Sequence, residues 1–370
     1  MTTAPAEIPA FARNAVNLAS AGLGAKALFA TDEFFAEVNR MLSDIAPVFD
    51  PDKYDDHGKY MDGWESRRKR GPGHDYAVVR LAAPGVVRGF DVDTSFFTGN
   101  YPPEVSVEGC GVEGHPAPDE LAVASWFTLV PRSPVAGDSR NPFSVDVPTR
   151  VTHVRLSIYP DGGVARLRVH GEPVPDPRLF PGGLVDLAAL ENGGRVTACS
   201  NMFYGVPSNL LRPGLARVMG EGWETARRRD DGNDWVEVAL AAPGRIMLAE
   251  LDTTHFKGNA PGEAQLGGAN GADAHWLQLL PRTRLQPDTR HRFPIAVRAD
   301  VGRVRMDVYP DGGMARLRLW GRPGVAAVEQ LTRRWYGSLP EEQAARALAD
   351  SGTPTVQGLI AALRAAWHRA

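Results

Sequence analysis

Apolar and polar residues alternate over many short stretches of this chain, and glycine, proline or asparagine separates one stretch from the next. From Val154 to Ile158, and again from Ala165 to Val169, every second residue is apolar. A period of two predicts β-strands with one buried face. Comparable runs lie at 76–81, 86–92, 105–108 and 126–130. Because the runs are short and end at turn residues, we expect an all-β fold of antiparallel jelly-roll sandwiches.

The turn residues 160–163, Pro-Asp-Gly-Gly, stand between two of these runs and predict a β-hairpin. A four-residue loop would place Arg155 opposite Arg168 and every apolar residue opposite another apolar residue. Arg166 would then lie beside both arginines on the polar face. A second Tyr-Pro-Asp-Gly-Gly turn stands at 309–313, and the same register there pairs Arg305 with Arg318.

The chain contains an internal duplication. Residues 159–171 return as 309–321 with ten of the thirteen positions identical, and 62–65 return as 221–224. Equivalent residues are 169 positions apart in a fainter match that opens each copy (18–35 over 187–204), 159 apart from Asp62 to Asn100, and 150 apart from Pro131 on. The first copy therefore carries nine additional residues between Asn100 and Pro131. A unit of about 150 residues is a domain rather than a solenoid repeat. We therefore predict repeat 1 at 1–178 and repeat 2 at 179–325.

The remaining segment, 326–370, has no counterpart in repeat 1 and predicts a short helical tail. From Pro340 on it is rich in alanine, leucine, glutamate and arginine, which favour helix. The residues Gly352-Thr353-Pro354 predict a break in that helix.

Composition narrows the classes of function. The formal charge is −3, and no apolar run reaches 18 residues, so we expect neither a nucleic-acid partner nor a membrane span. The cysteines Cys110 and Cys199 are not equivalent in the duplication. Unpaired cysteines without an export signal favour a reducing cytoplasm. The nine histidines show no metal-binding spacing, so we predict no cofactor or metal, although an oxygen-ligated Mn²⁺ would leave no such signature.

Arginines that share a strand face are the first candidates for chemistry. A guanidinium group matches a carboxylate with two parallel hydrogen bonds, so the predicted face could bind an anionic substrate. Salt bridges to Glu65, Glu224, Asp93 or Asp252 would explain the same arginines structurally, and we keep both interpretations open. In the predicted register Ser157 faces Arg166, where repeat 2 has Asp307 facing Arg316. We therefore expect repeat 1 to contribute the anchor for a carboxylate.

Acidic residues beside tryptophans and at strand ends are the second candidates. Glu65 and Glu224 could transfer protons, or could pair with the arginines that follow them. Asp93 and Asp252 end an apolar strand and begin a loop, where they could serve a site or hold the loop by side-chain hydrogen bonds. The candidate substrate-binding residues are Arg68, Asn100, Arg155, Arg166, Arg168, Arg227, Asn259, Arg316 and Arg318.

One candidate differs between the copies. His255 in the loop of repeat 2 corresponds to Phe96 in repeat 1. A histidine that is present in only one copy is a candidate for a catalytic role there, because imidazole exchanges protons near neutral pH.

These segments together resemble the allantoicase family. The resemblance is carried by 28–35 (Leu-Phe-Ala-Thr-Asp-Glu-Phe-Phe), 62–68 (Asp-Gly-Trp-Glu-Ser-Arg-Arg), 90–100 and the two Tyr-Pro-Asp-Gly-Gly turns. It implies two galactose-binding-like jelly-roll repeats and hydrolysis of allantoate to ureidoglycolate and urea in purine breakdown. It also implies a homo-oligomer, with a hexamer reported in the family, and it assigns no residue roles.

If allantoate is the substrate, arginines suit its carboxylate, Glu65 or Asp93 the acid and base, and Asn100 the ureido groups. Two other functions stay open at this stage. A jelly-roll domain can be a non-catalytic binding module, although such sugar binders usually present aromatic platforms rather than arginines. A related hydrolase acting on ureidoglycolate is the third possibility.

Overall fold

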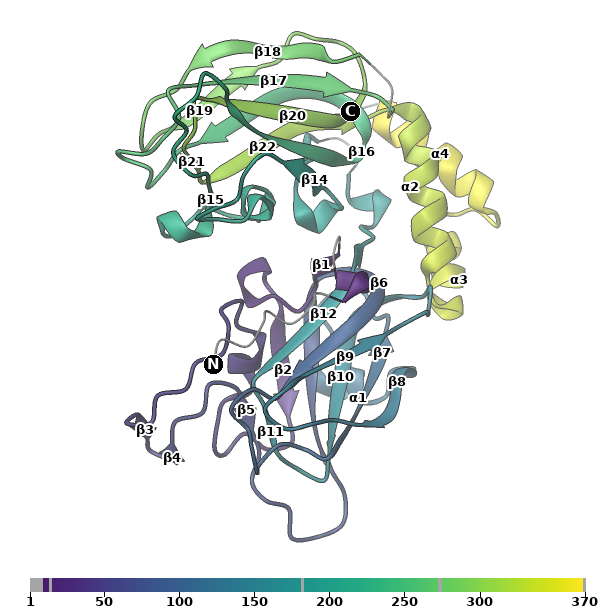
Figure 1. Ribbon diagram of the computed structural model, residues 1–370. Helices are drawn as coiled ribbons and strands as arrows, with labels where there is room; N and C mark the ends of the chain where they lie inside the picture. Colours follow the sequence, from purple (N-terminus) through teal and green to yellow (C-terminus); the bar gives the residue numbers. More distant parts are fainter. Residues whose placement is uncertain (1–8, 13–14, 181–182, 272–274, 369–370) are drawn as a thin grey trace. The chain divides into compact units, whose positions relative to one another are not determined.

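The computed structural model describes residues 9–12, 15–180, 183–271 and 275–368 (Figure 1). Two compact units are present, one formed by Met1–Val174 with Ser338–Arg346 and the other by Pro175–Gly337 with Ala347–Ala370. Each unit is built on one repeat, and both repeats are β-structures. The prediction of two tandem β-sandwich repeats with a helical tail is confirmed.

In repeat 1 the strand order is β1-β12-β6-β10-β7-β8, and β2 and β9 also pair with β6. The strands are β1 (Val16–Asn17), β2 (Lys26–Ala30), β6 (Asp75–Asp93), β7 (Glu104–Cys110), β8 (Phe127–Pro134), β9 (Arg140–Ser144), β10 (Arg150–Tyr159) and β12 (Arg166–Pro173). Short pairs join β3 (Tyr54–Asp55) to β4 (Gly58–Lys59) and β5 (Trp64–Glu65) to β11 (Gly163–Val164). The helical turns are η1 (Ala10–Ala12), η2 (Ala21–Leu23), η3 (Val38–Leu42) and α1 (Pro118–Ala122).

Repeat 2 has the same topology, in the order β13-β22-β16-β20-β17-β18 with β14 and β19 on β16. Its strands are β13 (Val185–Asp186), β14 (Arg195–Cys199), β16 (Asp234–Asp252), β17 (Glu263–Ala269), β18 (Leu277–Arg284), β19 (Arg290–Pro294), β20 (Val301–Tyr309) and β22 (Arg316–Pro323), with β15 (Trp223–Glu224) paired to β21 (Gly313–Met314). The helical turns are η4 (Pro177–Leu179), η5 (Leu190–Asn192), η6 (Pro207–Leu211) and η7 (Met219–Glu221).

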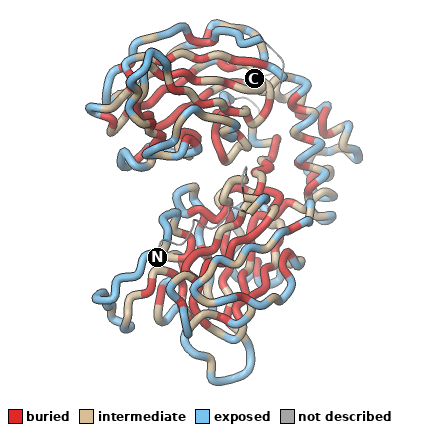
Figure 2. Tube along the Cα trace, in the orientation of Figure 1, coloured by how far each residue is buried: buried red, intermediate tan, exposed pale blue. Residues whose placement is uncertain are grey.

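The long strand β6 belongs to both layers of its sandwich. Its first half pairs with β2 and β10, and its second half pairs with β9 and β12. Side chains that alternate along these strands meet in the interior, where Val79, Phe90, Leu156 and Leu167 are fully buried. Figure 2 shows buried positions along the strands of both repeats. The alternating pattern therefore predicted the buried faces correctly.

The predicted hairpin register is wrong, because β10 and β12 are separated by β6 and lie in different layers. Arg155 is opposite Val78 and Glu108, whereas Arg168 is opposite Asp91. The same correction holds in repeat 2, where Arg305 lies opposite Glu237 and Arg318 opposite Glu250. The physical reason is that two strands facing one core from opposite layers show the same alternation as two adjacent strands.

The Tyr-Pro-Asp-Gly-Gly segment instead packs against the Gly-Trp-Glu-Ser segment. The amide of Ser66 donates to the carbonyl of Gly162 at 3.2 Å, and β11 pairs with β5. A Cβ on Gly163 would overlap the buried Phe97 ring, and one on Gly63 would lie 2.5 Å from the carbonyl oxygen of Val164. Repeat 2 keeps the same contact between Gly313 and its own buried phenylalanine. Close backbone approach therefore explains why these glycines recur in both repeats.

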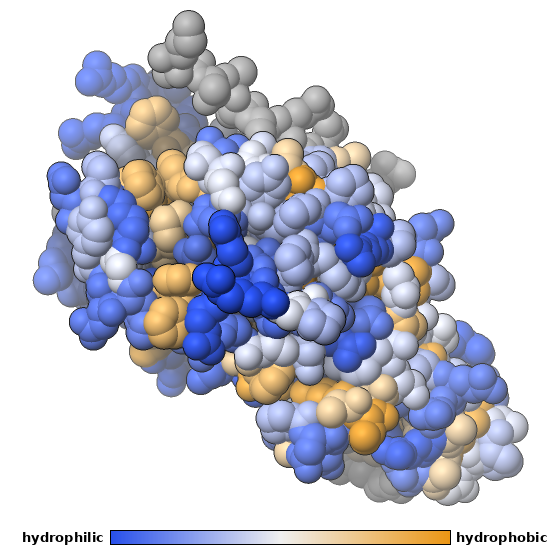
Figure 3. Space-filling view, turned by 90° about the horizontal axis from the view of Figure 1, so that it is seen from below, coloured by the Kyte–Doolittle hydropathy of each residue, from blue (hydrophilic) through white to orange (hydrophobic). Residues whose placement is uncertain are grey.

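The C-terminal segment forms α2 (Val325–Ser338), α3 (Glu341–Asp350) and α4 (Val356–His368), which confirms the predicted break near Gly352. The helices begin earlier than the composition indicated, and a further break falls at Leu339–Pro340. No described helix is both long enough and apolar enough to cross a membrane. On the face seen in Figure 3, hydrophobic residues form small groups among hydrophilic ones.

Candidate functional site

The structure brings Glu65 and Asn100 together in repeat 1, and Glu224 and Asn259 in repeat 2. The amide of Asn100 donates to Oε1 of Glu65 at 2.7 Å, and that of Asn259 donates to Oε1 of Glu224 at 2.6 Å. In each repeat the glutamate lies on the short strand after the buried tryptophan, and the asparagine follows the long central strand. These carboxyl–amide pairs join two candidates that the sequence predicted separately.

Burial, partly offset by the Asn100 hydrogen bond, raises the pKa of Glu65 above its ordinary value. A carboxyl group that holds its proton more tightly is better suited to donate it near neutral pH. Arg68 and Arg227, which follow the two glutamates, are exposed, and within the described part of the chain neither has an ion-pair or hydrogen-bond partner. The alternative in which these arginines pair with the glutamates is therefore not the one that the described residues show.

Asp93 and Asp252 hold the loops that follow them. Oδ1 of Asp93 accepts hydrogen bonds from the amide and the hydroxyl of Ser95 at 2.8 and 2.5 Å. Oδ1 of Asp252 accepts the same two bonds from Thr254. His255 has a left-handed backbone, with φ of 73°, and its Nε2 lies 2.9 Å from the carbonyl oxygen of Ala216. The loop-holding interpretation of the two aspartates is the one that the geometry supports.

Arg155 and Arg305 lie on β10 and β20, in the opposite layer from the candidate arginines of β12 and β22. Arg155 pairs with Glu108 at 2.6 Å and stacks over the Trp126 ring at 4.7 Å. Arg305 pairs with Asp307 at 3.1 Å. The hairpin register implied that three guanidinium groups converge on one anion, and the structure does not show this convergence.

Arg166 and Arg316 are buried beneath the loops that precede the Gly-Trp-Glu segments. Arg166 pairs with Asp62 at 2.6 Å and donates to the carbonyl of Ile45 at 2.8 Å. Arg316 donates to three carbonyl groups, and within the described residues it has no carboxylate partner. Burial, with the neighbouring charge of Arg318, lowers the pKa of Arg316 to about 10. The less neutralised arginine is thus in repeat 2, so the expectation that favoured repeat 1 rested on a wrong register.

Arg318 borders a cavity of about 460 Å³ that lies wholly within repeat 2, and we call it the repeat 2 cavity. Arg318 is 7% exposed and pairs with Asp186 at 3.5 Å. Arg318 also donates to the carbonyls of Arg212 and Gly214. Its repeat 1 counterpart, Arg168, makes the equivalent bonds to the carbonyls of Ser43 and Ile45. The ionisable residues that line the repeat 2 cavity are Asp186, Glu191, Glu250, Arg290 and Arg318.

Electrostatics distinguish the acids of the repeat 2 cavity. Burial raises the pKa of Glu191, although the positive charge of Arg318 opposes this, and Oε2 of Glu191 is buried without a hydrogen-bond partner. Burial also raises the pKa of Asp186. Burial acts in the same direction on Glu250, but hydrogen bonds from Arg290 and Arg292 outweigh it and lower the pKa of Glu250. The cavity therefore contains both a carboxyl group whose pKa is raised by burial and a carboxylate held in ion pairs.

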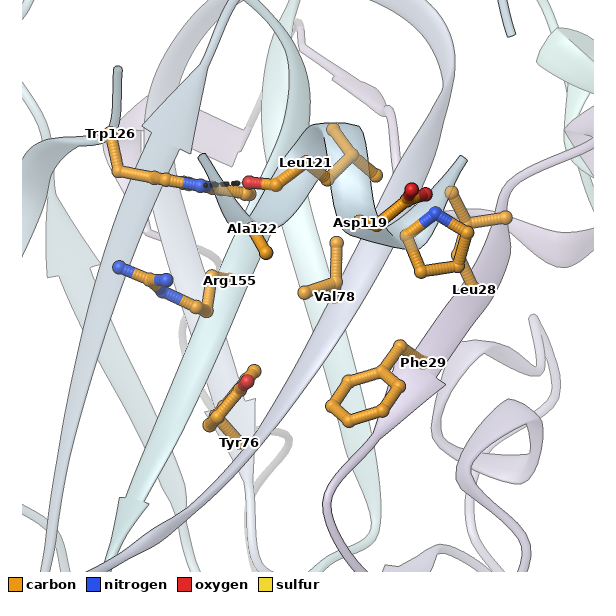
Figure 4. Close-up of a pocket in the computed structure, with 10 residues that line it drawn as sticks. Leu28, Phe29, Tyr76, Val78, Asp119, Leu121, Ala122, Trp126 and Arg155 are labelled. Carbon is orange, nitrogen blue, oxygen red and sulfur yellow. Dashed lines mark hydrogen bonds between the residues drawn. The ribbon is translucent and has the colours of Figure 1, made fainter. Parts of the chain in front are cut away.

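A smaller pocket of about 260 Å³ lies in repeat 1 beneath α1 (Figure 4). The helix α1 lies between Asn100 and Pro131, where repeat 1 carries its additional residues. Tyr76, Trp126 and Arg155 form one side of it, and Phe29 and Leu121 border it on the other. The Arg155 charge is already paired with Glu108, so this pocket is chiefly apolar. It offers a charged substrate less than the repeat 2 cavity does.

Sequence reasoning missed Asp186, Glu191, Glu250 and Arg290. The available signal was the difference between the repeats, since Glu191 stands where repeat 1 has Gly22. Among the described residues, no three histidine, cysteine, aspartate or glutamate side chains are grouped so as to hold a metal ion.

Comparison with known proteins follows the duplicated architecture. The allantoicase repeat family matches residues 16–174 and 185–324. The chain is 58% identical over 311 residues to a probable allantoicase of Nocardia farcinica, covering 83% of this chain and 94% of that protein. It is 49% identical over 332 residues to a probable allantoicase of Streptomyces avermitilis, covering 86% and 88%. A solved allantoicase of Saccharomyces cerevisiae superposes with a TM-score of 0.73 at 31% identity, covering 84% of this chain and 94% of that one. The chain therefore belongs to the allantoicase family.

Proposed function

We propose that this protein is a hydrolase that cleaves allantoate to ureidoglycolate and urea in purine degradation. The observation that carries the proposal is the match of both repeats to the allantoicase family, with 58% identity to a probable allantoicase along most of its length. The geometry adds support, because the chain offers carboxyl–amide pairs and a cavity bordered by guanidinium groups.

The reaction makes three demands on a site. Allantoate carries one carboxylate and two ureido groups on a single carbon, so a cation must anchor the carboxylate and polar groups must orient the ureido groups. Breaking one C–N bond also needs a proton for the departing urea nitrogen, and a general acid supplies it. The second ureido nitrogen can stabilise the positive charge that develops on carbon with its lone pair.

The residues named from the sequence meet these demands unequally. Glu65 and Glu224 suit proton transfer, and Asn100 and Asn259 suit contacts to a ureido group. Arg155, Arg166 and Arg316 already use their guanidinium groups inside the fold. Arg318 is also engaged, with Asp186 and two carbonyl groups, but it borders the repeat 2 cavity. Asp93 and Asp252 are weaker candidates for acid or base, since each already holds a loop.

A direct assay tests the proposal. Purified protein is incubated with allantoate, and urea and ureidoglycolate are quantified together. We expect equal amounts of the two products and no urea from ureidoglycolate supplied alone. Binding without turnover would favour a non-catalytic module, and urea from ureidoglycolate would favour the third possibility.

We further propose that the enzyme works in the cytoplasm as a homo-oligomer and without a metal cofactor. The two cysteines are unpaired, which suits a reducing compartment. Size-exclusion chromatography with light scattering measures the oligomeric state, and a monomer at micromolar concentration would contradict that part of the proposal.

A further inference from the structure

Repeat 2 differs from repeat 1 most clearly at one place on the outer face of β22. There Arg318 lies opposite Glu250, as Arg168 lies opposite Asp91 in repeat 1. The charged residues around these matched pairs have diverged, whereas the aromatic residue is kept, as Phe11 in repeat 1 and as Phe180, which borders the cavity, in repeat 2. The internal duplication thus provides a comparison within one chain.

In repeat 1 the charges at this place balance and an aromatic side chain covers it. Arg140 pairs with Asp91 at 2.6 Å, and Asp44 acts electrostatically on Arg168. The Phe11 ring of η1 lies 5.8 Å from the His170 ring. A Cβ added to Gly89 of the neighbouring strand would lie 2.5 Å from the same Phe11 ring. This face of repeat 1 is therefore filled by the chain itself.

In repeat 2 the corresponding place is the cavity of about 460 Å³. Pro213 replaces Asp44 and Asp186 replaces Asn17, so the number of carboxylates other than Glu191 is unchanged, while Arg292 replaces Pro142 and adds one guanidinium. Arg290 and Arg292 pair with the carboxylate of Glu250, and Arg318 pairs with that of Asp186. Three guanidinium groups thus share two carboxylates besides the Glu191 carboxyl, and the cavity suits a monoanionic ligand when that carboxyl carries its proton.

Glu191 supplies the second requirement. It stands where repeat 1 has Gly22, and its Oε2 is buried without a hydrogen-bond partner. Buried polar atoms are almost always hydrogen-bonded, so an unpaired carboxyl oxygen on a residue that lines a cavity is available to a ligand there. Burial also raises the pKa of this carboxyl, which favours the form that can donate a proton.

We propose that the repeat 2 cavity is the substrate site, in which Arg290 and Arg318 bind the carboxylate of a ureido acid and Glu191 protonates the departing urea. This assignment rests on the proposed function and deepens it, because it places the reaction in one repeat. It differs from the residues named from the sequence, among which only Arg318 lines this cavity.

The step balances with water as the second reactant. The C–N bond to one ureido group breaks, Glu191 gives its proton to the leaving nitrogen, and the other ureido nitrogen forms a C=N bond with its lone pair. Water then adds its oxygen to the carbon, and the C=N electron pair returns to nitrogen. One water proton passes to the Glu191 carboxylate, which restores the acid and leaves urea and ureidoglycolate.

The substitution Arg290→Gln tests the anchor, and Arg140→Gln at the matched position of repeat 1 is its control. Arg290 lies at the exposed edge of the cavity, so its loss is not expected to unfold the repeat. The binding probe is hydantoate, which has the carboxylate and one ureido group of allantoate but no second group to expel. By calorimetry we expect R290Q to bind hydantoate at least tenfold more weakly than wild type, and R140Q to bind it equally. Equal binding by R290Q and R140Q would overturn the anchor.

Glu191→Gln tests the acid, because glutamine keeps the shape and hydrogen-bonding groups but has no proton to give. We expect kcat for allantoate to fall at least a hundredfold while hydantoate binding stays near the wild-type value. Glu191→Gly, which introduces the residue of repeat 1, should lose turnover similarly. A kcat within threefold of wild type for either folded variant would overturn the assignment of Glu191. If wild type binds hydantoate through Arg290 yet releases no urea from allantoate, the proposed function fails and the binding site stands.

Discussion

The contact between Gly163 and Phe97 gives the sharpest prediction about why the duplicated motif is retained. Phe97 is fully buried, and a Cβ on Gly163 would overlap its ring, with the ring carbon Cζ only 2.7 Å away. Gly163 is not among the residues with positive φ, so the cost of Gly163→Ala is steric rather than conformational. Overpacking a closed core typically costs about 1–3 kcal/mol, and a ring with no free side places this substitution near about 3 kcal/mol.

The assay is thermal unfolding of the full chain by calorimetry. For a domain of this size, about 1 kcal/mol shifts Tm by about 2–4 °C, so G163A should lower the repeat 1 transition by about 6–12 °C. Phe97→Ala alone should destabilise by about 3–5 kcal/mol. In the double variant the new methyl group occupies the space that the ring vacates, so we expect a coupling of at least about 2 kcal/mol. Effects that add within about 0.5 kcal/mol would refute the steric argument.

Three further predictions concern charge and metal dependence. Asp62→Asn leaves the guanidinium of Arg166, which is 1% exposed, without its carboxylate, so we expect the free energy of unfolding in urea to fall by about 3 kcal/mol. Glu221→Gln at the matched position should change it little, because Glu221 pairs with an exposed arginine. Equal losses in the two variants would contradict this. Burial raises the pKa of Glu65, so the folded state binds this proton more tightly and the contribution of Glu65 to stability falls as the pH rises above about 4.3. Glu65→Gln should therefore gain stability relative to wild type between pH 5 and pH 8, and a pH-independent difference would refute this. Dialysis against EDTA should leave allantoate turnover intact, and activity that returns only with added Mn²⁺ would count against a metal-free reaction.

The sequence was sufficient to predict the fold class and the buried faces of the strands, but not which strands pair. Alternation between Val154 and Ile158 and between Ala165 and Val169 correctly marked faces that meet in the core. It could not show that the two strands lie in opposite layers, because a neighbour across the sandwich and a neighbour in the sheet impose the same period. The pairing depends on the 19-residue strand β6, which joins both layers.

The candidate site was predictable only where the duplication marked it. Glu65 and Asn100 recur at one spacing in both repeats, and they prove to be hydrogen-bonded. The ionisable residues of the repeat 2 cavity are spread along the chain from Asp186 to Arg318, and nothing in their local sequence links them. Glu191 was visible as a difference from Gly22, but its meaning depends on a cavity that only the folded chain forms.

The central claim is that allantoate is cleaved in the repeat 2 cavity. A crystal structure of Glu191→Gln soaked with allantoate tests it most directly, since the slow variant should retain the uncleaved substrate. We predict the substrate carboxylate at Arg290 and Arg318 and a ureido nitrogen at residue 191. Substrate bound instead at the Glu65–Asn100 or Glu224–Asn259 pair, with the repeat 2 cavity empty, would contradict the account.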